Sequence, residues 1–531
     1  MAIAPQVQPD IAHSAPTHKW LVALAVMLGT ALEVLDTSIV NVALPHMQGA
    51  FSASVDEVAW VLTSYLVANG IMIPMTAWIS SRFGRKRYFL TSVFAFVAAS
   101  ALCGAAQSLT QIITFRMIQG AAGAAMIPSS QAILMETFPP EEQQMAMALW
   151  GMGLMVAPIV GPTLGGWITD NWNWRWNFYI NLPVGFVAFT MVSAFVHDPP
   201  YMRQTRAQKG RVDYLGILLL ILSLGALQIV LDRGQRADWF NSPWVVYATA
   251  LSVLAFVALT LHELHFTEPI LDLRTLKLRI FDAALVVTIT FSAVLFGTLL
   301  LSPVFLQELL GYNAWQAGLV QAPRGIAAMI SMMVVGNLAR FGVDTRKFIG
   351  LGFVLVSIGC WYSSRFNLQL GMWQIIWPAM VMSFGFGMVF PPSSAAAISC
   401  VSRERMGYAA SLYNMMRNTG AAVGIAWMTN MLISQQQIHQ SRLVEHFSVF
   451  DAWRLSNKIQ TMPDAPTFSY LPQMITGQKQ SLGIIYAAVQ AQAAMLSFND
   501  IYRILAIGTL IMVPSFLLMR GARSSGTVSA H

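Results

Sequence analysis

Charged side chains are scarce in this chain: Asp, Glu, Lys and Arg make up only 10% of its 531 residues. Cysteine is scarcer still, and Cys103, Cys360 and Cys400 stand in no CxxC spacing and beside no histidine cluster. This pattern indicates neither a disulfide framework nor a metal site. The sequence also has no P-loop, HExxH or nucleophile-elbow motif, so we expect no enzyme and no cofactor. Its loops are too short for the soluble domain of a receptor or sensor.

Apolar residues dominate instead, at 56% of the chain and a mean hydropathy of +0.57. Because a helix needs about 20 apolar residues to cross the hydrocarbon, the sequence predicts an all-α integral membrane protein with about fourteen spans. The expected spans are approximately 20–44, 57–79, 87–106, 110–135, 144–169, 178–197, 213–231, 243–262, 281–306, 315–338, 347–366, 373–399, 406–434 and 499–520. The start resembles no signal or transit peptide, so we expect the first helix to be retained.

The net charge of +7 has its origin in short loops on one side of the predicted bundle, such as the loop with Arg82, Arg85 and Lys86. Positively charged loops stay in the cytoplasm during insertion. We therefore predict a multi-pass membrane protein with both termini cytoplasmic. The basic balance reflects topology, and no nucleic acid partner is expected.

Internal repetition predicts the domain organisation. Arg82-Phe83-Gly84 follows the second span, and Arg340-Phe341-Gly342 follows the tenth. Because the two tripeptides occupy corresponding positions in the predicted topology, they imply two six-helix halves with a helix pair inserted between them. Such halves normally enclose a midplane cavity used for transport. The expected parts are a cytoplasmic tail at 1–18, an N-terminal half at 19–197, a cytoplasmic loop at 198–212, the inserted pair at 213–265, a C-terminal half at 266–520 with a periplasmic loop at 435–497, and a cytoplasmic tail at 521–531.

Two interpretations of the long periplasmic connection stay open. Residues 481–497 have apolar side chains at helical spacing, which favours an outward extension of the last helix where an adaptor docks. A solvated or disordered loop is the alternative.

Asp36 stands inside the first span, where a carboxylate costs several kcal/mol unless it is paired, protonated or wetted. At 1.5 Å per residue, Asp36 lies roughly 12 Å and Arg116 of the fourth span roughly 9 Å inside the outer ends of their helices. The two can therefore share one level. We interpret them as a proton-coupling pair, and a static ion pair between helices is the alternative. Glu33, three residues earlier, either shares the protonation or faces a water-filled vestibule.

The motifs now become recognisable. Residues 35–45 (LDTSIVNVALP) resemble the first-helix motif of the fourteen-helix drug:proton antiporters in the major facilitator superfamily. Residues 116–120 (RMIQG) resemble that superfamily's fourth-helix motif, and residues 157–166 (APIVGPTLGG) its antiporter motif. The resemblance covers nearly the whole chain and implies the major facilitator fold. It is nearest to the EmrB-type exporters. This resemblance implies a place in the bacterial inner membrane, with a periplasmic adaptor and, through it, an outer-membrane channel as partners.

Arg417, in the thirteenth span, stands where this branch is usually basic. The resemblance favours a cavity-facing or coupling role for it, and hydrogen bonds to backbone carbonyls are the alternative. Substrate contacts are less defined, because 31 Met, 30 Phe and 16 Trp offer much soft apolar surface. The candidates for substrate binding are Asn41, Tyr65, Asn69, Gln119, Gln131, Trp150, Met155 and Asn414.

Two further motifs are candidates for gating. The loop motif at 77–86 has Ala77 for the usual glycine and Ser81 for the usual aspartate, which weakens the case for a gating latch at Arg82, Gly84 and Arg85. These basic residues are also explained as topology determinants. In the fifth span the candidates are Pro158, Gly161, Pro162 and Gly165, and small residues there also simply pack helices.

Taken together, the sequence predicts a proton-coupled antiporter that exports lipophilic drugs or toxic compounds by alternating access. The alternative within transport is a proton-driven exporter of an endogenous metabolite, siderophore or aromatic acid. The expected partners are small lipophilic substrates, protons and membrane lipids, besides the adaptor and the outer channel.

Overall fold

The computed structural model describes residues 18–198, 212–266, 269–341, 343–344, 346–445 and 478–518. Within these ranges the chain is helical with short connections, and no strand occurs in them. The predicted tails at 1–18 and 521–531 and the predicted loop at 198–212 fall almost wholly on residues outside them. The all-helical expectation is confirmed for the part of the chain that is described.

Seven longer helices and two short ones occupy residues 19–195. They are α1 (Lys19–Phe51), α2 (Val55–Val58), α3 (Trp60–Phe83), α4 (Arg85–Ala105), α5 (Leu109–Gly123), α6 (Met126–Thr137), α7 (Gln143–Asn171), α8 (Trp176–Tyr179) and α9 (Asn181–Phe195). The span predicted at 110–135 is therefore divided into α5 and α6. Pro128 explains the division, since it has no N–H to bond the carbonyl of Ala124. That carbonyl instead accepts a hydrogen bond from Thr76 Oγ1 at 3.4 Å.

The remaining helices run from residue 214 to residue 518. They are α11 (Tyr214–Arg233), α12 (Pro243–His265), α13 (Arg279–Pro303), α14 (Ala314–Arg340), α15 (Arg346–Ser363), α16 (Met372–Ser399), α17 (Met406–Glu445), α19 (Gln478–Ile511) and α20 (Ser515–Leu518). The π-helical turn η4 (Val304–Leu309) and the 3-10 turns η1 (Gln235–Ala237), η2 (Trp239–Asn241), η3 (Leu273–Lys277) and η5 (Arg403–Arg405) lie between them.

The structure corrects two boundaries near the end of the chain. The loop predicted at 435–497 is helical on both sides, because α17 continues to Glu445 and α19 begins at Gln478. Helix propagation is cooperative, so a long helix readily continues beyond an apolar segment. The last span, predicted at 499–520, ends at Ile511, three residues before Pro514, which cannot donate to the helix. The helical extension over 481–497 is thus present, and residues 446–477 lie outside the described ranges.

Among the described helices, eleven are long and apolar enough to cross a membrane. The other predicted spans coincide with α5 and α6, with α15 and with α17. Neither α5 nor α6 reaches 18 residues by itself, α15 begins with Arg346 and Lys347, and α17 is rich in polar residues. Length and composition therefore support most, but not all, of the predicted spans one by one.

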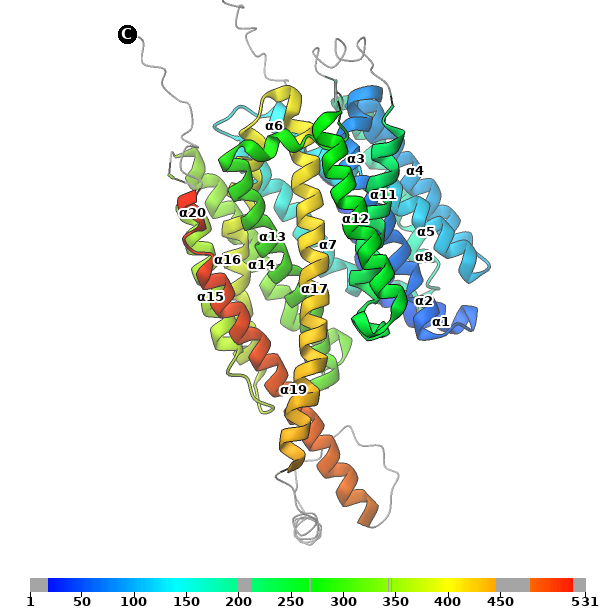
Figure 1. Cartoon of the computed structure of the whole chain (residues 1–531), viewed down its shortest axis with the longest axis vertical. Coiled ribbons are helices and arrows are strands. Elements are labelled where there is room, and N and C mark those ends of the chain that lie inside the picture. The colour runs from blue at the N-terminus through cyan, green and yellow to red at the C-terminus, as the bar shows by residue number, and fades with distance from the viewer. Residues whose placement is uncertain are drawn as a thin grey trace, which may run out of the picture.

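The helices form one elongated bundle in which the long helices lie side by side along its length (Figure 1). We call the end at which α1 begins the proximal end, and the opposite end the distal end. α1, α3, α4, α5, α7 and α9 pack with one another, and so do α13 to α17 and α19. The first set is called group N here and the second group C. α6 lies in group N by its chain position and contacts α1, α7 and α17.

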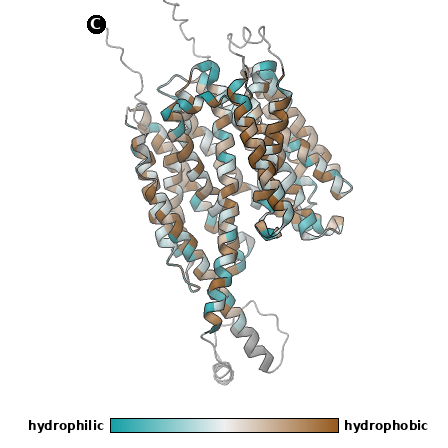
Figure 2. Ribbon diagram, viewed as in Figure 1, coloured by the Kyte–Doolittle hydropathy of each residue, from teal (hydrophilic) through white to brown (hydrophobic). Residues whose placement is uncertain are grey.

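The helices α11 and α12 lie at the flank of the bundle, where α11 packs along α3 and contacts α17, and α12 packs on α11. In Figure 2 both helices are hydrophobic over most of their length, while hydrophilic residues collect at the ends of the bundle. Tyr247 and Leu254 of α12 are 74% and 69% exposed, as expected of side chains that face lipid. The predicted domain boundaries themselves stay a prediction.

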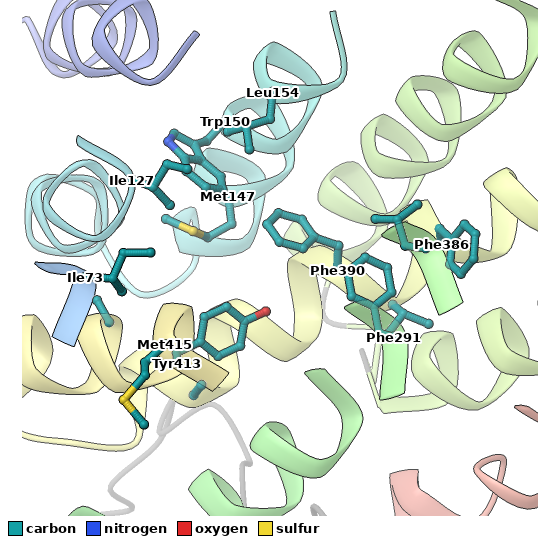
Figure 3. Packing of buried hydrophobic residues seen from close by; sticks show 14 of the residues in the cluster. Ile73, Ile127, Met147, Trp150, Leu154, Phe291, Phe386, Phe390, Tyr413 and Met415 are labelled. Atoms are coloured by element: carbon teal, nitrogen blue, oxygen red, sulfur yellow. The ribbon is translucent and has the colours of Figure 1, made fainter. Parts of the chain in front are cut away.

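The buried interior between the two groups is apolar and aromatic. Figure 3 shows Trp150 and Met147 of α7 opposite Phe390 and Phe386 of α16, with Tyr413 of α17 below them. The rings of Trp150 and Phe390 are stacked, with centroids 5.8 Å apart. This aromatic contact joins group N to group C.

Candidate transport site

Asp36 and Arg116 meet in the interior of group N, as their predicted depths require. Both side chains are 0% exposed, and Arg116 Nη1 lies 2.5 Å from Asp36 Oδ2. α1 brings the carboxylate and α5 the guanidinium. Removing either partner would leave an unpaired buried charge, which typically costs 3–5 kcal/mol.

The second carboxylate oxygen of Asp36 also has donors. Asp36 Oδ1 accepts from Gln119 Nε2 at 2.9 Å and from Asn181 Nδ2 at 2.7 Å. Gln119 Oε1 in turn accepts from Arg116 Nη1 at 2.9 Å. Asp36 is therefore held by three side chains from two neighbouring helices, and charge-assisted hydrogen bonds of this kind are the stronger ones in proteins.

Arg116 is oriented by α3 as well as by Asp36. Its Nε donates to the carbonyl of Val61 at 3.2 Å, and its guanidinium lies 4.2 Å from the centroid of the Tyr65 ring. Gly120, one turn after Arg116, lets α5 approach this part of α3, because a Cβ at Gly120 would overlap the backbone carbonyl of Tyr65. The arginine thus lies on an aromatic face inside a tight helix contact.

Glu33 lies one turn before Asp36 on α1 and has fewer partners. It is 5% exposed, and its Oε1 accepts from Asn69 Nδ2 at 2.9 Å. The same Asn69 nitrogen donates to the carbonyl of Gly120 at 3.3 Å. Glu33 Oε2 is buried and has no hydrogen-bond partner among the described residues. The predicted residues Glu33 and Asn69 are therefore brought together next to the Asp36 cluster.

Arg417 comes from group C, where it lies on α17. It is half-buried on α17 and makes no hydrogen bond or ion pair with any residue in the described ranges. It lies within electrostatic reach of Glu33 and of Tyr413. The alternative in which its guanidinium bonds backbone carbonyls is not what the structure shows.

Gln131 and Asn414 form a direct contact between the groups. Asn414 Nδ2 donates to Gln131 Oε1 at 2.5 Å, and both side chains are fully buried. Trp150 lies beside them, and its Nε1 donates to Ser130 Oγ at 2.9 Å. Three of the predicted substrate-binding residues thus gather at one place between α6, α7 and α17.

Two other substrate-binding candidates lie apart from these clusters. Asn41 is exposed on α1, five residues beyond Asp36. Met155 is half-buried on α7 and packs against the main hydrophobic cluster. The structure brings neither of them to Asp36, and their role in substrate binding stays a prediction.

The loop motif lies at the proximal end, where α3 ends and α17 begins. Gly84 joins α3 to α4 with φ at 92°, a left-handed conformation that favours glycine. Arg85 forms an ion pair with Glu136 at the end of α6. Its Nη2 also lies 3.3 Å from where a Cβ of Gly407 on α17 would stand. Arg82 lies over the ring of Trp78, 5.0 Å from its centroid.

Ala77, which stands for the usual glycine of the loop motif, makes a contact of its own. Its backbone N–H donates to Ser411 Oγ of α17 at 3.1 Å, in the buried contact between α3 and α17. The proximal end is thus bridged by Ala77–Ser411, by Gln131–Asn414 and by the approach of Arg85 to Gly407. A gating role for this end stays a prediction.

The glycines of the fifth span pack α7 on α1. A Cβ at Gly161 would lie 2.5 Å from Ser38 Cβ, and one at Gly165 would lie 3.0 Å from Ile39 Cγ2. Pro162 is exposed, and the side chain of Pro158 lies outside the part of the chain that the structure describes. Close helix packing is therefore present here, one turn from Asp36.

Sequence reasoning missed Asn181 and Glu136 as site residues. Asn181 is fully buried at the start of α9 and donates to Asp36 and, at 2.9 Å, to Ser100 Oγ. An amide at the edge of an apolar span was the available signal. No group of three or more His, Cys, Asp or Glu residues in the described ranges is placed to hold a metal ion.

A bundle of apolar helices that buries a carboxylate, a guanidinium and several amides in its interior has the make-up of a polytopic membrane transporter. A model of the Major Facilitator Superfamily matches residues 26–425 of the chain. The chain therefore belongs to the Major Facilitator Superfamily, within the family of the multidrug export protein EmrB. The predicted fold class and the resemblance on which it was argued are confirmed.

Three known proteins illustrate the relationship. Multidrug export protein EmrB of Escherichia coli (strain K12) is 35% identical over 485 residues, which cover 91% of each chain. Fatty acid resistance protein FarB of Neisseria gonorrhoeae is 33% identical over 510 residues, covering 95% of this chain and 97% of FarB. The crystal structure of the human organic anion transporter MFSD10 (TETRAN) aligns with a TM-score of 0.59 at 14% identity, over 94% of this chain and 99% of that one.

These relationships show the class of transporter and the membrane in which it lies. The chain is a secondary transporter of the drug-export type and a multi-pass inner-membrane protein, since eleven of its described helices are long and apolar enough to cross a membrane and it is related to a multidrug export protein. The structural likeness to MFSD10 supports the fold alone.

Proposed function

We propose that this chain exports lipophilic drugs or toxic compounds in exchange for protons, with Asp36 as an ionisable centre of the coupling. A proton from outside neutralises Asp36, its attraction to Arg116 weakens, and the two helix groups rock between openings to either side. The substrate leaves as the proton enters. The single observation that carries the proposal is the fully buried Asp36–Arg116 pair at 2.5 Å.

Three features of the interior support transport between groups N and C. Buried charges inside membrane helices typically mark ion or substrate paths. The aromatic residues Trp150, Phe390 and Phe291 provide an apolar surface that tolerates varied ligand shapes. At the proximal end the hydrogen bonds Ala77–Ser411 and Gln131–Asn414 join the two groups, and each is a single bond of modest free energy.

The orientation and partners belong to the same proposal. The proximal end carries Arg82, Arg85 and the start of α1, and the positive-inside rule places it in the cytoplasm together with both termini. The distal end is then periplasmic. There α17 and the first turns of α19 project beyond the other helices (Figure 1). This projecting pair offers a place for a periplasmic adaptor and, through it, an outer-membrane channel.

The test uses purified protein in proteoliposomes with an imposed pH difference. We expect the wild type to move a fluorescent lipophilic substrate uphill, and Asp36→Asn to lose this by at least a factor of 10, because the variant carries no titratable group at this position. Arg116→Ala should lose it as well, since it leaves Asp36 unpaired. Glu308→Gln, an exposed carboxyl on η4, is the matched control and should transport normally. Uphill transport retained by Asp36→Asn at matched reconstitution would refute the coupling role.

A further inference from the structure

The cluster around Asp36 lies wholly within group N. Its members come from α1, α5 and α9, and Arg116 is further oriented by α3. Rocking of one helix group against the other moves these helices together, so the Asp36–Arg116 distance is not required to change. The electrostatic energy of an ion pair inside one rigid group therefore changes little during this motion. The separation of a charge pair that spans both groups changes with the motion directly.

Glu33 and Arg417 are such a pair. Glu33 belongs to α1 of group N, Arg417 belongs to α17 of group C, and the two lie within electrostatic reach of each other. Neither is bonded to the other, because no ion pair links them within 4.0 Å. Their separation depends on how the two groups sit relative to one another.

Both side chains have unused bonding capacity in the described structure. Glu33 is 5% exposed and its Oε2 has no hydrogen-bond partner among the described residues. Arg417 is half-buried and has neither a hydrogen bond nor an ion pair within the described ranges. Leaving a buried charge without a partner costs several kcal/mol. The free energy therefore falls when the Glu33 and Arg417 side chains approach each other, or when a proton removes the charge on Glu33.

The other groups around Glu33 are few. Asn69 of α3 holds Oε1, and the ionisable groups within reach are Asp36 on α1, Tyr65 on α3 and Arg417 on α17. The negative charge of Asp36 is balanced by its ion pair with Arg116, and the Tyr65 ring lies against that same guanidinium. Arg417 is thus the one nearby cation, among the described residues, that does not already pair with a carboxylate.

We propose that Glu33 and Arg417 form a second ionisable site, at which one further proton is carried and linked directly to the relative motion of the two helix groups. This inference rests on the proposed function, which supplies the proton exchange. A proton arriving from the distal side bonds to Glu33 Oε2, the carboxylate loses its charge, and its attraction to Arg417 ends. When the proximal side opens, the proton leaves Oε2, and the carboxylate attracts Arg417 again.

The site has a thermodynamic consequence, which is a second proton in each transport cycle. One proton that moves down one pH unit supplies about 1.4 kcal/mol, which is a tenfold substrate accumulation. With the membrane potential clamped to zero and an uncharged lipophilic dye as substrate, the slope of log accumulation against the pH difference counts the protons. We expect a slope of two for the wild type, or about 100-fold accumulation for each pH unit.

The variants separate the second site from the first. Glu33→Gln and Arg417→Gln should lower the slope from two to one, so accumulation at one pH unit falls about tenfold. Arg417→Lys keeps the cation and should keep a slope of two. Glu308→Gln and Arg365→Gln, both exposed, are the matched controls for carboxyl and guanidinium loss. A purely structural role would lower the amount of active protein and leave the slope unchanged.

The outcomes are distinguishable. A slope of zero in the wild type overturns the proposed proton exchange itself. A slope of one in the wild type, or a slope of two in Glu33→Gln, overturns the second site while proton exchange stands. If Glu33→Gln does not fold, Arg417→Gln against Arg417→Lys decides the same question, because equal slopes in those two variants contradict the pairing.

Discussion

Two carboxylates three residues apart on α1 have different surroundings. Asp36 has a donor at each oxygen, supplied by Arg116, Gln119 and Asn181, whereas Glu33 has one donor, Asn69. The helical spacing explains the proximity, since residues three apart lie on nearby faces. It does not explain the difference, which arises because α5 and α9 pack against the Asp36 turn while α3 packs against the Glu33 turn.

Asn181 offers a test at the scale of one residue. Asn181→Leu removes the hydrogen bonds to Asp36 Oδ1 and Ser100 Oγ and leaves a charged acceptor with one donor fewer. We expect a loss of about 1.5–3 kcal/mol in stability, because a hydrogen bond to a charged group contributes about that much. The measurement is the thermal unfolding midpoint in detergent. Asn171→Leu is the matched control, since Asn171 is exposed and bonds only the Trp167 carbonyl. Equal midpoints for the two variants would contradict the assignment.

At the scale of helices, the fit of α7 on α1 depends on glycines. Gly161 faces Ser38 and Gly165 faces Ile39, and both contacts lie within the two turns of α1 that follow Asp36. Any side chain at these positions would separate the two helices. The same close approach keeps α1 in a fixed place, so it also fixes the position of Asp36 against α5 and α9.

Substitution at Gly161 tests this contact. Gly161→Val puts a Cβ 2.5 Å from Ser38 Cβ, and we expect a destabilisation of about 1–3 kcal/mol from overpacking, with reduced efflux. Gly508→Val on α19 is the matched control, because a Cβ there meets nothing within 4 Å. The measurements are thermal stability in detergent and dye efflux from cells at equal expression. Normal efflux and stability in Gly161→Val would remove this glycine from the mechanism.

At the scale of the whole molecule, the hydrogen bonds between groups N and C in the described part of the chain lie at the proximal end. Ala77 bonds Ser411, Gln131 bonds Asn414, and Arg85 approaches Gly407. The structure is therefore closed at that end. Alternating access requires these contacts to break when the proximal end opens. The first two are single hydrogen bonds, each with a modest free energy.

Loss of the Gln131–Asn414 bond should favour the proximal-open state. In a variant without Cys103, Cys360 and Cys400, a cysteine introduced by Ser411→Cys reports access to this end, since Ser411 is 2% exposed. We expect Asn414→Leu to raise its labelling rate by a membrane-impermeant thiol reagent about fivefold, because one hydrogen bond is worth about 1 kcal/mol. Asn367→Leu, in an exposed distal loop, is the control. An unchanged rate in Asn414→Leu would show that this bond does not hold the end closed.

Much of the molecule follows from the sequence alone. Apolar runs of about 20 residues predict the helices, and the alternation of their directions places Asp36 and Arg116 at one level, because helix rise and hydropathy are local properties. The break between α5 and α6 also has a local cause in Pro128, although the pattern of apolar residues conceals it. The far extension of α17 to Glu445 is hidden for the opposite reason, since its polar residues give no apolar signal.

The tertiary structure decided which polar groups touch. Asn181 reaches Asp36 from 145 residues away, and Asn414 reaches Gln131 across 283 residues. It also decided that Glu33, rather than Asp36, keeps a carboxylate oxygen without a donor among the described residues. The physical reason is that such contacts depend on how each helix is rotated about its axis and how closely its neighbours approach. Rotation and approach are set by packing with distant segments, which no local pattern records.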